Sequence, residues 1–202
     1  MSLYRLTASL LNSWLRATDP DACGDEYADF LKDLGREQRP TSPAAKAGIK
    51  FEEEVFKYSR LDAMTTDAYS NAETLAIVQF GQRVRGACYQ VRGEKEITVS
   101  GLRVNLVGVA DFIHAGIITD IKRVQRYEYG KYQFSAQHPM YMEIFPEALR
   151  FDYLIFDGAY CYMEQYRRGD FIPIQQTAAR FMDYLDGAGL MGLYQEKWRE
   201  KS

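Results

Sequence analysis

The sequence predicts an α/β protein in which one central mixed β-sheet is flanked by helices. Segments with the apolar spacing of amphipathic helices alternate with short apolar runs rich in β-branched residues. The resulting order of helix, strands, helix, strands and helix is typical of a sheet covered by helices. The 202 residues are enough for one domain, spanning residues 1–202, with a substantial core.

The first part of the chain, residues 1–43, is expected to be a helical region. Apolar residues at helical spacing predict a helix over residues 5–16, with Thr7 as its N-cap. A weaker pattern predicts a helix over residues 26–34 that ends at Gly35. Two prolines in residues 38–43 indicate a connector.

The core is expected over residues 44–167, followed by C-terminal helices over 168–202. Helical spacing, strand-like runs and glycine punctuation set the bounds of each element. In order, we expect a helix over 44–61, successive strands over 73–124, a helix over about 127–145, a hairpin of 150–156 and 159–167 turned at Asp157-Gly158, and helices over 173–186 and about 190–201.

Composition limits the classes of function. The net charge of −3 and the pI near 5.5 give no global case for nucleic-acid binding, so any such surface must be local. Three widely spaced cysteines, Cys23, Cys88 and Cys161, indicate reduced thiols in a cytoplasmic protein and offer no Cys-x-x-Cys spacing for zinc or an iron–sulfur cluster. No apolar run approaches membrane-spanning length.

The most informative segment is residues 105–124, two strand-like runs joined at Ala115-Gly116. A two-residue loop there, or a four-residue loop from His114 to Ile117, places Asp111 directly opposite Asp120 on one face, and alternation adds Lys122. An odd-length loop would shift that register. Two close carboxylates repel unless a cation lies between them, which favours a metal site. The alternative is a structural Asp–Lys ion pair at the end of a hairpin.

The helix over 44–61 contributes a third candidate carboxylate. Of its three consecutive glutamates, only Glu52 falls within the apolar stripe expected to face the sheet. Glu53 is expected to pair with Lys57 on the exposed side, and Glu54 to point elsewhere.

The helix expected after the hairpin carries Gln137 and Tyr141, four residues apart and therefore on one face. Pro139 between them removes a backbone donor and is expected to kink the helix. The densest basic cluster precedes the pair and includes Lys122, Arg123, Arg126, Lys131 and the aromatic Tyr132. Cations interleaved with aromatics suit a phosphate backbone and stacked bases, although a solvated helix face explains the same residues.

Four elements in this order resemble the PD-(D/E)XK nuclease superfamily, specifically its RecB-like exonuclease branch. They are Gly48–Glu52 (Gly-x-x-x-Glu), Gly108–Asp111 (Gly-Val-Ala-Asp), Asp120–Lys122 (Asp-Ile-Lys) and Gln137–Tyr141 (Gln-x-x-x-Tyr). The opening Leu-Thr-Ala-Ser-Leu-Leu-Asn-Ser-Trp-Leu is similar to the N-terminal helix of that branch, so the resemblance covers about residues 5–165. Iron–sulfur relatives use four cysteines, which this chain lacks, so it looks more like the cluster-free bacterial and phage members.

The resemblance implies a restriction-endonuclease-like core and a DNA exonuclease that depends on Mg²⁺ or Mn²⁺, without an iron–sulfur cluster. Its substrate would be single- or double-stranded DNA ends in recombination, repair or mobile-element processing. The catalytic set it implies is Glu52, Asp111, Asp120, Lys122, Gln137 and Tyr141, and the metal ligands are Glu52, Asp111, Asp120 and the Ile121 carbonyl. Arg123, Arg126, Lys131 and Tyr132 are the expected nucleic-acid contacts.

Two other functions are consistent with the sequence. One is a nuclease-like module that binds DNA or a protein without cutting, and the other is a metal-dependent phosphoesterase acting on small substrates. The chain is weakly acidic and so attracts DNA weakly. A helicase, an annealing protein or a ring-shaped oligomer is therefore a candidate for strengthening DNA binding. His114 and His138 lie near no cysteine or serine that would form a nucleophile pair, which favours structural or surface roles.

Overall fold

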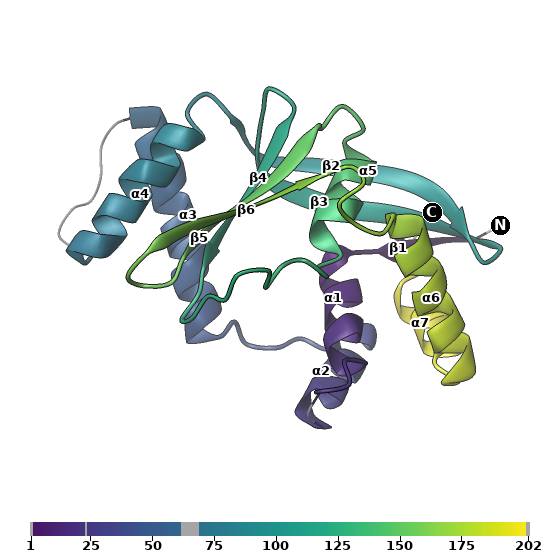
Figure 1. Ribbon diagram of the computed structural model, residues 1–202. Coiled ribbons are helices and arrows are strands. Elements are labelled where there is room, and N and C mark those ends of the chain that lie inside the picture. Colours follow the sequence, from purple (N-terminus) through teal and green to yellow (C-terminus); the bar gives the residue numbers. More distant parts are fainter. Residues whose placement is uncertain (1, 23, 62–68, 201–202) are drawn as a thin grey trace.

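The computed structural model describes residues 2–22, 24–61 and 69–200 and confirms a mixed sheet flanked by helices (Figure 1). The strands are β1 (Leu3–Leu6), β2 (Cys88–Val99), β3 (Leu102–His114), β4 (Ile117–Arg123), β5 (Arg150–Phe156) and β6 (Cys161–Arg167). The helices are α1 (Ala8–Ala17), α2 (Gly24–Leu34), α3 (Pro43–Leu61), α4 (Asn71–Arg83), α5 (Gln137–Ile144), α6 (Ile174–Gly187) and α7 (Met191–Lys197).

The sheet has the order β1-β3-β4-β5-β6, with β2 paired along the other edge of β3. β1 and β4 therefore share one edge of β3. β1 pairs in parallel with residues Arg103–Leu106, and β4 pairs antiparallel with Phe112–His114. Between these two ladders, residues 107–111 of β3 have no strand partner on that edge in the described part of the chain.

Two apolar cores cover opposite faces of this sheet. On one face α3 and α4 pack on Ile121, Leu154 and Phe156, and on the other α1, α2, α5, α6 and α7 pack on Ile118 and Phe151. Alternate residues of β4 and β5 go to different cores, as strand geometry requires. In Figure 1, α3 and α4 lie at one end of the sheet, away from α1, α2, α6 and α7.

Several expected elements are confirmed with small shifts of their ends. Thr7 is the N-cap of α1, and its side chain accepts a hydrogen bond from the Leu10 N–H at 3.3 Å. The hairpin of β5 and β6 turns after Asp157, whose carboxylate accepts bonds from the backbone N–H groups of Ala159 and Tyr160. The short parallel strand β1 was not predicted, because its four residues belong equally well to a helical apolar pattern.

The expectation of successive strands over 73–124 is wrong at its start, where α4 forms. Ser70 and Glu73 make a complete capping box, and the buried side chains Ala76, Ile77 and Phe80 follow helical spacing. A Cβ at Gly81 would lie 2.6 Å from the Tyr58 ring, so this glycine permits close packing of α3 and α4 and does not mark a turn.

The helix expected over 127–145 is shorter than predicted and begins only at Gln137. Pro139 therefore lies in the first turn of α5, where a helix has no use for the missing N–H, and no kink is needed. The preceding residues 124–136 form turns and irregular backbone.

No helix in residues 2–22, 24–61 and 69–200 combines the length and the apolar character needed to cross a bilayer. Cys88 and Cys161 are free and exposed, and Cys23 lies outside the described residues.

Candidate active site

The turn between β3 and β4 sets the register of the site. Ala115 and Gly116 have φ values of 47° and 76°, as a two-residue hairpin loop requires, and His114 pairs with Ile117. The predicted register is therefore confirmed near the turn. The last pair of this ladder is Phe112–Thr119, one position before Asp111 and Asp120.

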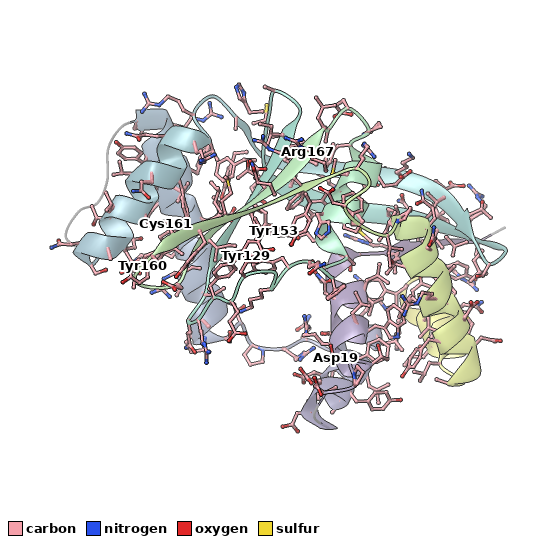
Figure 2. All side chains as sticks on the ribbon, in the orientation of Figure 1. Asp19, Tyr129, Tyr153, Tyr160, Cys161 and Arg167 are labelled. Carbon is pink, nitrogen blue, oxygen red and sulfur yellow. The ribbon has the colours of Figure 1, made fainter. Side chains whose placement is uncertain are left out.

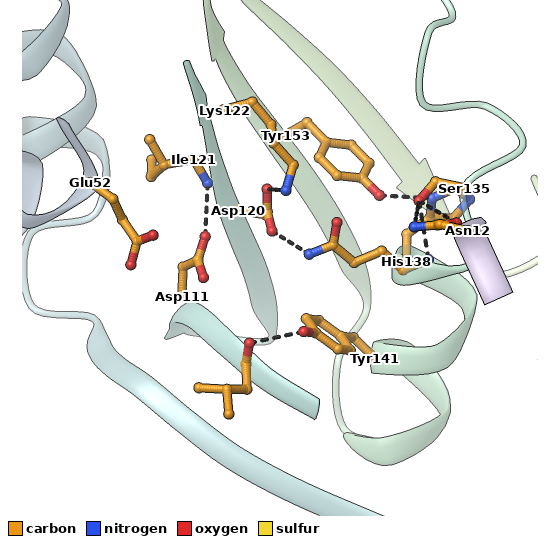
Figure 3. A network of polar contacts seen from close by, with 12 residues as sticks. Asn12, Glu52, Asp111, Asp120, Ile121, Lys122, Ser135, His138, Tyr141 and Tyr153 are labelled. Atoms are coloured by element: carbon orange, nitrogen blue, oxygen red, sulfur yellow. Dashed lines mark hydrogen bonds and ion pairs between the residues drawn. The ribbon is translucent and has the colours of Figure 1, made fainter. Parts of the chain in front are cut away.

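Beyond that pair, β4 bonds to a side chain of β3 and not to its backbone. The Asp111 carboxylate accepts a hydrogen bond from the Ile121 N–H at 3.1 Å (Figure 3). Ala110 packs with the α1 and α5 core, whereas Phe112 packs with the α3 and α4 core, so the alternation of β3 breaks at Asp111. The expectation that Asp111 and Asp120 directly oppose each other on one face is corrected: Asp111 lies at the change of face and points toward β4.

The same irregularity appears in the neighbouring strand. Gln90 of β2 has a φ of 52°, and the β2–β3 ladder passes from Tyr89–Phe112 to Val91–Ala110 without pairing Gln90. A left-handed glutamine costs backbone energy that surrounding contacts must offset. Its amide donates to Glu52 Oε1 at 2.6 Å, so the strained residue positions a candidate ligand. No sequence signal marked Gln90.

Asp120 lies on the α5 side of β4 and is 2 % exposed. Its Oδ2 is 2.6 Å from Lys122 Nζ, and Gln137 donates a short hydrogen bond to its Oδ1. Apart from the ion pair, Oδ2 has no hydrogen-bond partner among the described residues. The predicted grouping of Asp120, Lys122 and Gln137 is thus present, and Figure 3 shows the Lys122 ammonium beside the Asp120 carboxylate.

Lys122 is a cation in this setting. Burial alone would lower the pKa of its ammonium, but the ion pair with Asp120 and the charge of Asp111 outweigh burial and leave the pKa raised. Its Nζ also lies 5.9 Å from the centre of the Tyr153 ring.

Glu52 approaches from the opposite face of the sheet, on α3. Burial raises the pKa of its carboxyl, partly offset by hydrogen bonds from Gln90 and Tyr89. In Figure 3 its carboxylate points toward Asp111. Glu54 differs from expectation: it is buried, and Lys57 pairs with it at 2.6 Å in place of Glu53.

The three carboxylates interact electrostatically through the opening between the ladders. Burial raises the pKa of Asp111 well above its ordinary value, and the charges of Asp120 and Glu52 raise it further. Lys122 and the Ile121 N–H oppose these effects. Even so, no group of three or more His, Cys, Asp or Glu side chains within residues 2–22, 24–61 and 69–200 is positioned to hold a metal ion.

Tyr141 completes the edge of the site. Its hydroxyl donates to the Val109 carbonyl at 2.9 Å, which satisfies an acceptor on the unpaired edge of β3. A Cβ at Gly108 would lie 2.3 Å from the Tyr141 ring, so the glycine is needed for this contact. Burial, with the charges of Asp120 and Asp111, raises the pKa of Tyr141 to about 12.

Of the four expected nucleic-acid contacts, two are engaged by other side chains and two are exposed. Glu73 holds the Arg123 guanidinium at 2.8 Å, and Tyr132 stacks on Tyr153 with ring centres 4.5 Å apart. Arg126 and Lys131 are exposed, on the irregular segment after β4. Of the histidines, His114 is exposed and His138 is fully buried beside Tyr153.

A cavity of about 410 Å³ opens beside the charged groups. Lys122, Gln137 and Tyr141 line one side, and α1 residues including Ser9, Asn12 and Arg16 line the other. The N-terminal helix therefore forms one wall of the space next to Asp120.

No protein-family model and no curated protein matches the chain. Among solved structures, the chain is similar to one described as "Crystal structure of SSO0001", with a TM-score of 0.55 and 17% sequence identity, covering 90% of this chain and 76% of that chain. At this identity the likeness concerns the fold alone.

Proposed function

We propose that this chain is a metal-dependent deoxyribonuclease that hydrolyses phosphodiester bonds from DNA ends, in recombination, repair or phage DNA processing. The observation that carries the proposal is the meeting of Asp111, Asp120 and Lys122, with Glu52 approaching from the other face, at the opening in the β3 edge. Like charges held close together are costly to the fold, and the need to hold a metal ion beside an anionic DNA backbone would account for them.

The donor set suits a hard divalent cation such as Mg²⁺ or Mn²⁺. Glu52, Asp111, Asp120 and the Ile121 carbonyl would hold it, since all are oxygen ligands. The closeness of the three carboxylates, whose charges raise the pKa of Asp111 beyond the effect of burial, favours a bound cation. When bound, the cation would polarise the phosphodiester and stabilise charge on the departing oxygen.

The remaining roles belong to side chains of this chain. Lys122 supplies a positive charge that orients a hydroxide and offsets charge on the phosphate. Gln137 fixes the rotamer of Asp120, and Tyr141 holds the unpaired edge of β3 through Val109. The cavity between Lys122 and α1 is the space for the nucleotide next to the scissile bond.

The test is cleavage of end-labelled linear DNA and closed circular DNA with and without Mg²⁺ or Mn²⁺. We expect linear DNA to be degraded and circles to survive, and Glu52→Gln to abolish cleavage while Glu53→Gln, its exposed neighbour on α3, keeps it. Cleavage of circles would make the enzyme an endonuclease. Equal inertness of the wild type and Glu52→Gln on all substrates would contradict the proposal.

A second candidate is a nuclease-like module that binds DNA or a protein without cutting it. One observation favours it: Lys122 and Gln137 already engage both carboxylate oxygens of Asp120. Isothermal titration with Mg²⁺ and Mn²⁺ separates the two candidates, because only the nuclease is expected to lose metal binding on Asp120→Asn.

A further inference from the structure

The segment between the candidate catalytic residues has a distinct construction. Residues 125–136 link Lys122 and Arg123 at the end of β4 to Gln137 at the start of α5. They contain four aromatic residues, Tyr127, Tyr129, Tyr132 and Phe134, together with the cations Arg126 and Lys131.

Two of these aromatic side chains anchor the segment. The Tyr127 hydroxyl donates to Glu164 at 2.7 Å, and its ring centre lies 4.6 Å from that of Tyr162. Tyr132 stacks on Tyr153 with an interplanar angle of 19°. The path of the backbone is therefore tied to β5 and β6 at two points.

The C-terminal end of the segment is tied to α1. Asn12 Oδ1 accepts the Ala136 N–H at 2.7 Å, and Asn12 Nδ2 donates to Ser135 Oγ at 3.1 Å. Backbone turns from Lys131 to Glu128 and from Gln133 to Gly130 fix the middle. A segment held in this way presents its outward side chains in a preorganised arrangement.

The other two aromatic side chains project into solvent. Tyr129, labelled in Figure 2, is one of them. Its exposed fraction is 93% and that of Phe134 is 81%, values that no core role explains. Arg126 and Lys131 lie beside them and are exposed too, with Arg126 in an exposed ion pair to Glu128. Exposed rings alternating with cations are a typical surface for single-stranded nucleic acid.

The exposed rings border a continuous series of hollows. A hollow of about 490 Å³ at Arg126 shares Tyr129 and Gly130 with one of about 530 Å³. That hollow shares Gln133 and Asp170 with a third, of about 460 Å³, which Phe134, Phe171 and Arg180 line. The series has the extended form that several successive nucleotides require.

We propose that this surface binds single-stranded DNA by stacking nucleobases on Tyr129 and Phe134. The proposal rests on the nuclease function and specifies its substrate class as DNA with a single-stranded end. A protein partner is less well matched, because Gly130, Lys131 and Gln133 lie between the two rings and the fourth intervening residue, Tyr132, stacks inward on Tyr153, so no contiguous aliphatic patch forms.

The test is fluorescence anisotropy with labelled oligothymidylate, in EDTA so that no cleavage intervenes, beside an abasic oligomer of equal length. We expect Tyr129→Ala/Phe134→Ala to weaken oligothymidylate binding by roughly tenfold or more and to leave binding of the abasic oligomer unchanged. Tyr129→Phe/Phe134→Tyr, which keeps both rings, should retain the affinity. Leu149→Ala, at a residue 73% exposed near the β3–β4 turn, is the matched control for loss of an exposed apolar side chain.

The outcomes separate this inference from the nuclease proposal. If the wild type cuts DNA but the double alanine variant keeps its affinity for oligothymidylate, the inference is wrong and the nuclease proposal stands. If binding depends on the rings but nothing is cut, the nuclease proposal fails and the binding surface stands. Absence of oligothymidylate binding by the wild type would overturn the inference and leave a protein as the occupant.

Discussion

The carboxylates of the two hairpins of the sheet differ in their interaction partners. In the β5–β6 hairpin all seven residues of β5 are paired, and Asp152 receives two bonds from Arg150, at 2.7 and 2.9 Å, while Glu164 receives bonds from Tyr127 and Tyr166. In the β3–β4 hairpin the ladder stops after three pairs, and Asp111 and Asp120 lie close to each other's charge.

The comparison distinguishes acids with structural partners from the acids of the candidate site. Asp152 and Glu164 have neutralising or hydrogen-bonding partners of their own, so each has a structural role in the hairpin. Asp111 is raised in pKa by burial and by the other acids, so the fold would be more stable without its charge. A buried acid that the fold does not need is a candidate for chemistry.

The largest expected effects come from removing the charge of one acid in each hairpin. Asp111→Asn should lower DNA cleavage by at least about a hundredfold and raise the melting temperature, because it removes a charge that the folded state disfavours. Asp152→Asn should cost roughly 2 kcal/mol of stability, because Arg150 loses its charged partner, and should leave cleavage intact. Calorimetry and single-turnover cleavage of both variants check this, and the opposite pattern would end the distinction.

The contact between Gly108 and Tyr141 allows a second comparison. Gly108→Ala should destabilise the protein by about 1–3 kcal/mol, because its Cβ would lie 2.3 Å from the Tyr141 ring. Tyr141→Leu should relieve part of this cost, which a double-mutant cycle measured by urea unfolding detects. Gly192→Ala is the control, since a Cβ there has nothing within 4 Å.

Acid should weaken the β5–β6 side through His138. Burial lowers the pKa of His138 from 6.5 to about 3, with a smaller opposing effect of Asp170. The unfolded chain therefore binds more protons between these pH values, so this contribution to stability is present above pH 6.5 and is lost as the pH falls toward 3.

His138→Gln should flatten that dependence, which reaches about 1.4 kcal/mol per pH unit for one group. The measurement is the free energy of unfolding at several pH values between 7 and 5. His114→Gln, at the exposed turn, should keep the wild-type slope, and an unchanged slope in His138→Gln would contradict the prediction.

The smallest effect is expected at Gln90, whose strained backbone positions the candidate ligand Glu52. Gln90→Ala and Gln90→Gly both remove the bond to Glu52 and should lower cleavage by roughly tenfold. Gln90→Gly should be more stable than Gln90→Ala by about 1 kcal/mol, because glycine adopts the φ of 52° without strain. Equal stability of the two variants would show that the backbone relaxes there.

Local chemistry explains which features the sequence predicted. The Ala115-Gly116 turn determined the β3–β4 register near the loop, and alternation placed Lys122 with Asp120. The fold class followed from periodicity. These features depend on residues close together in the chain, which is where pattern-based reasoning is strongest.

The features that were missed depend on contacts between distant segments. The change of face at Asp111 coincides with the irregular Gln90 in another strand, and Glu54 is buried on α3 although the apolar spacing had selected Glu52 for that face. The backbone of residues 125–136 is held by Tyr127 and Tyr132 against β5 and β6, which overrides its helical pattern.

The amide of Ile121, at the shared edge of β3, can report on ligand binding at the candidate site. Ile121 donates its N–H to a carboxylate and not to a neighbouring strand, so its hydrogen exchange is controlled by one side chain. Any ligand that draws Asp111 away would release this amide while the amides of the β5–β6 ladder stay protected. Exchange at a single backbone position thus registers occupancy of the site in solution, without a substrate or a label.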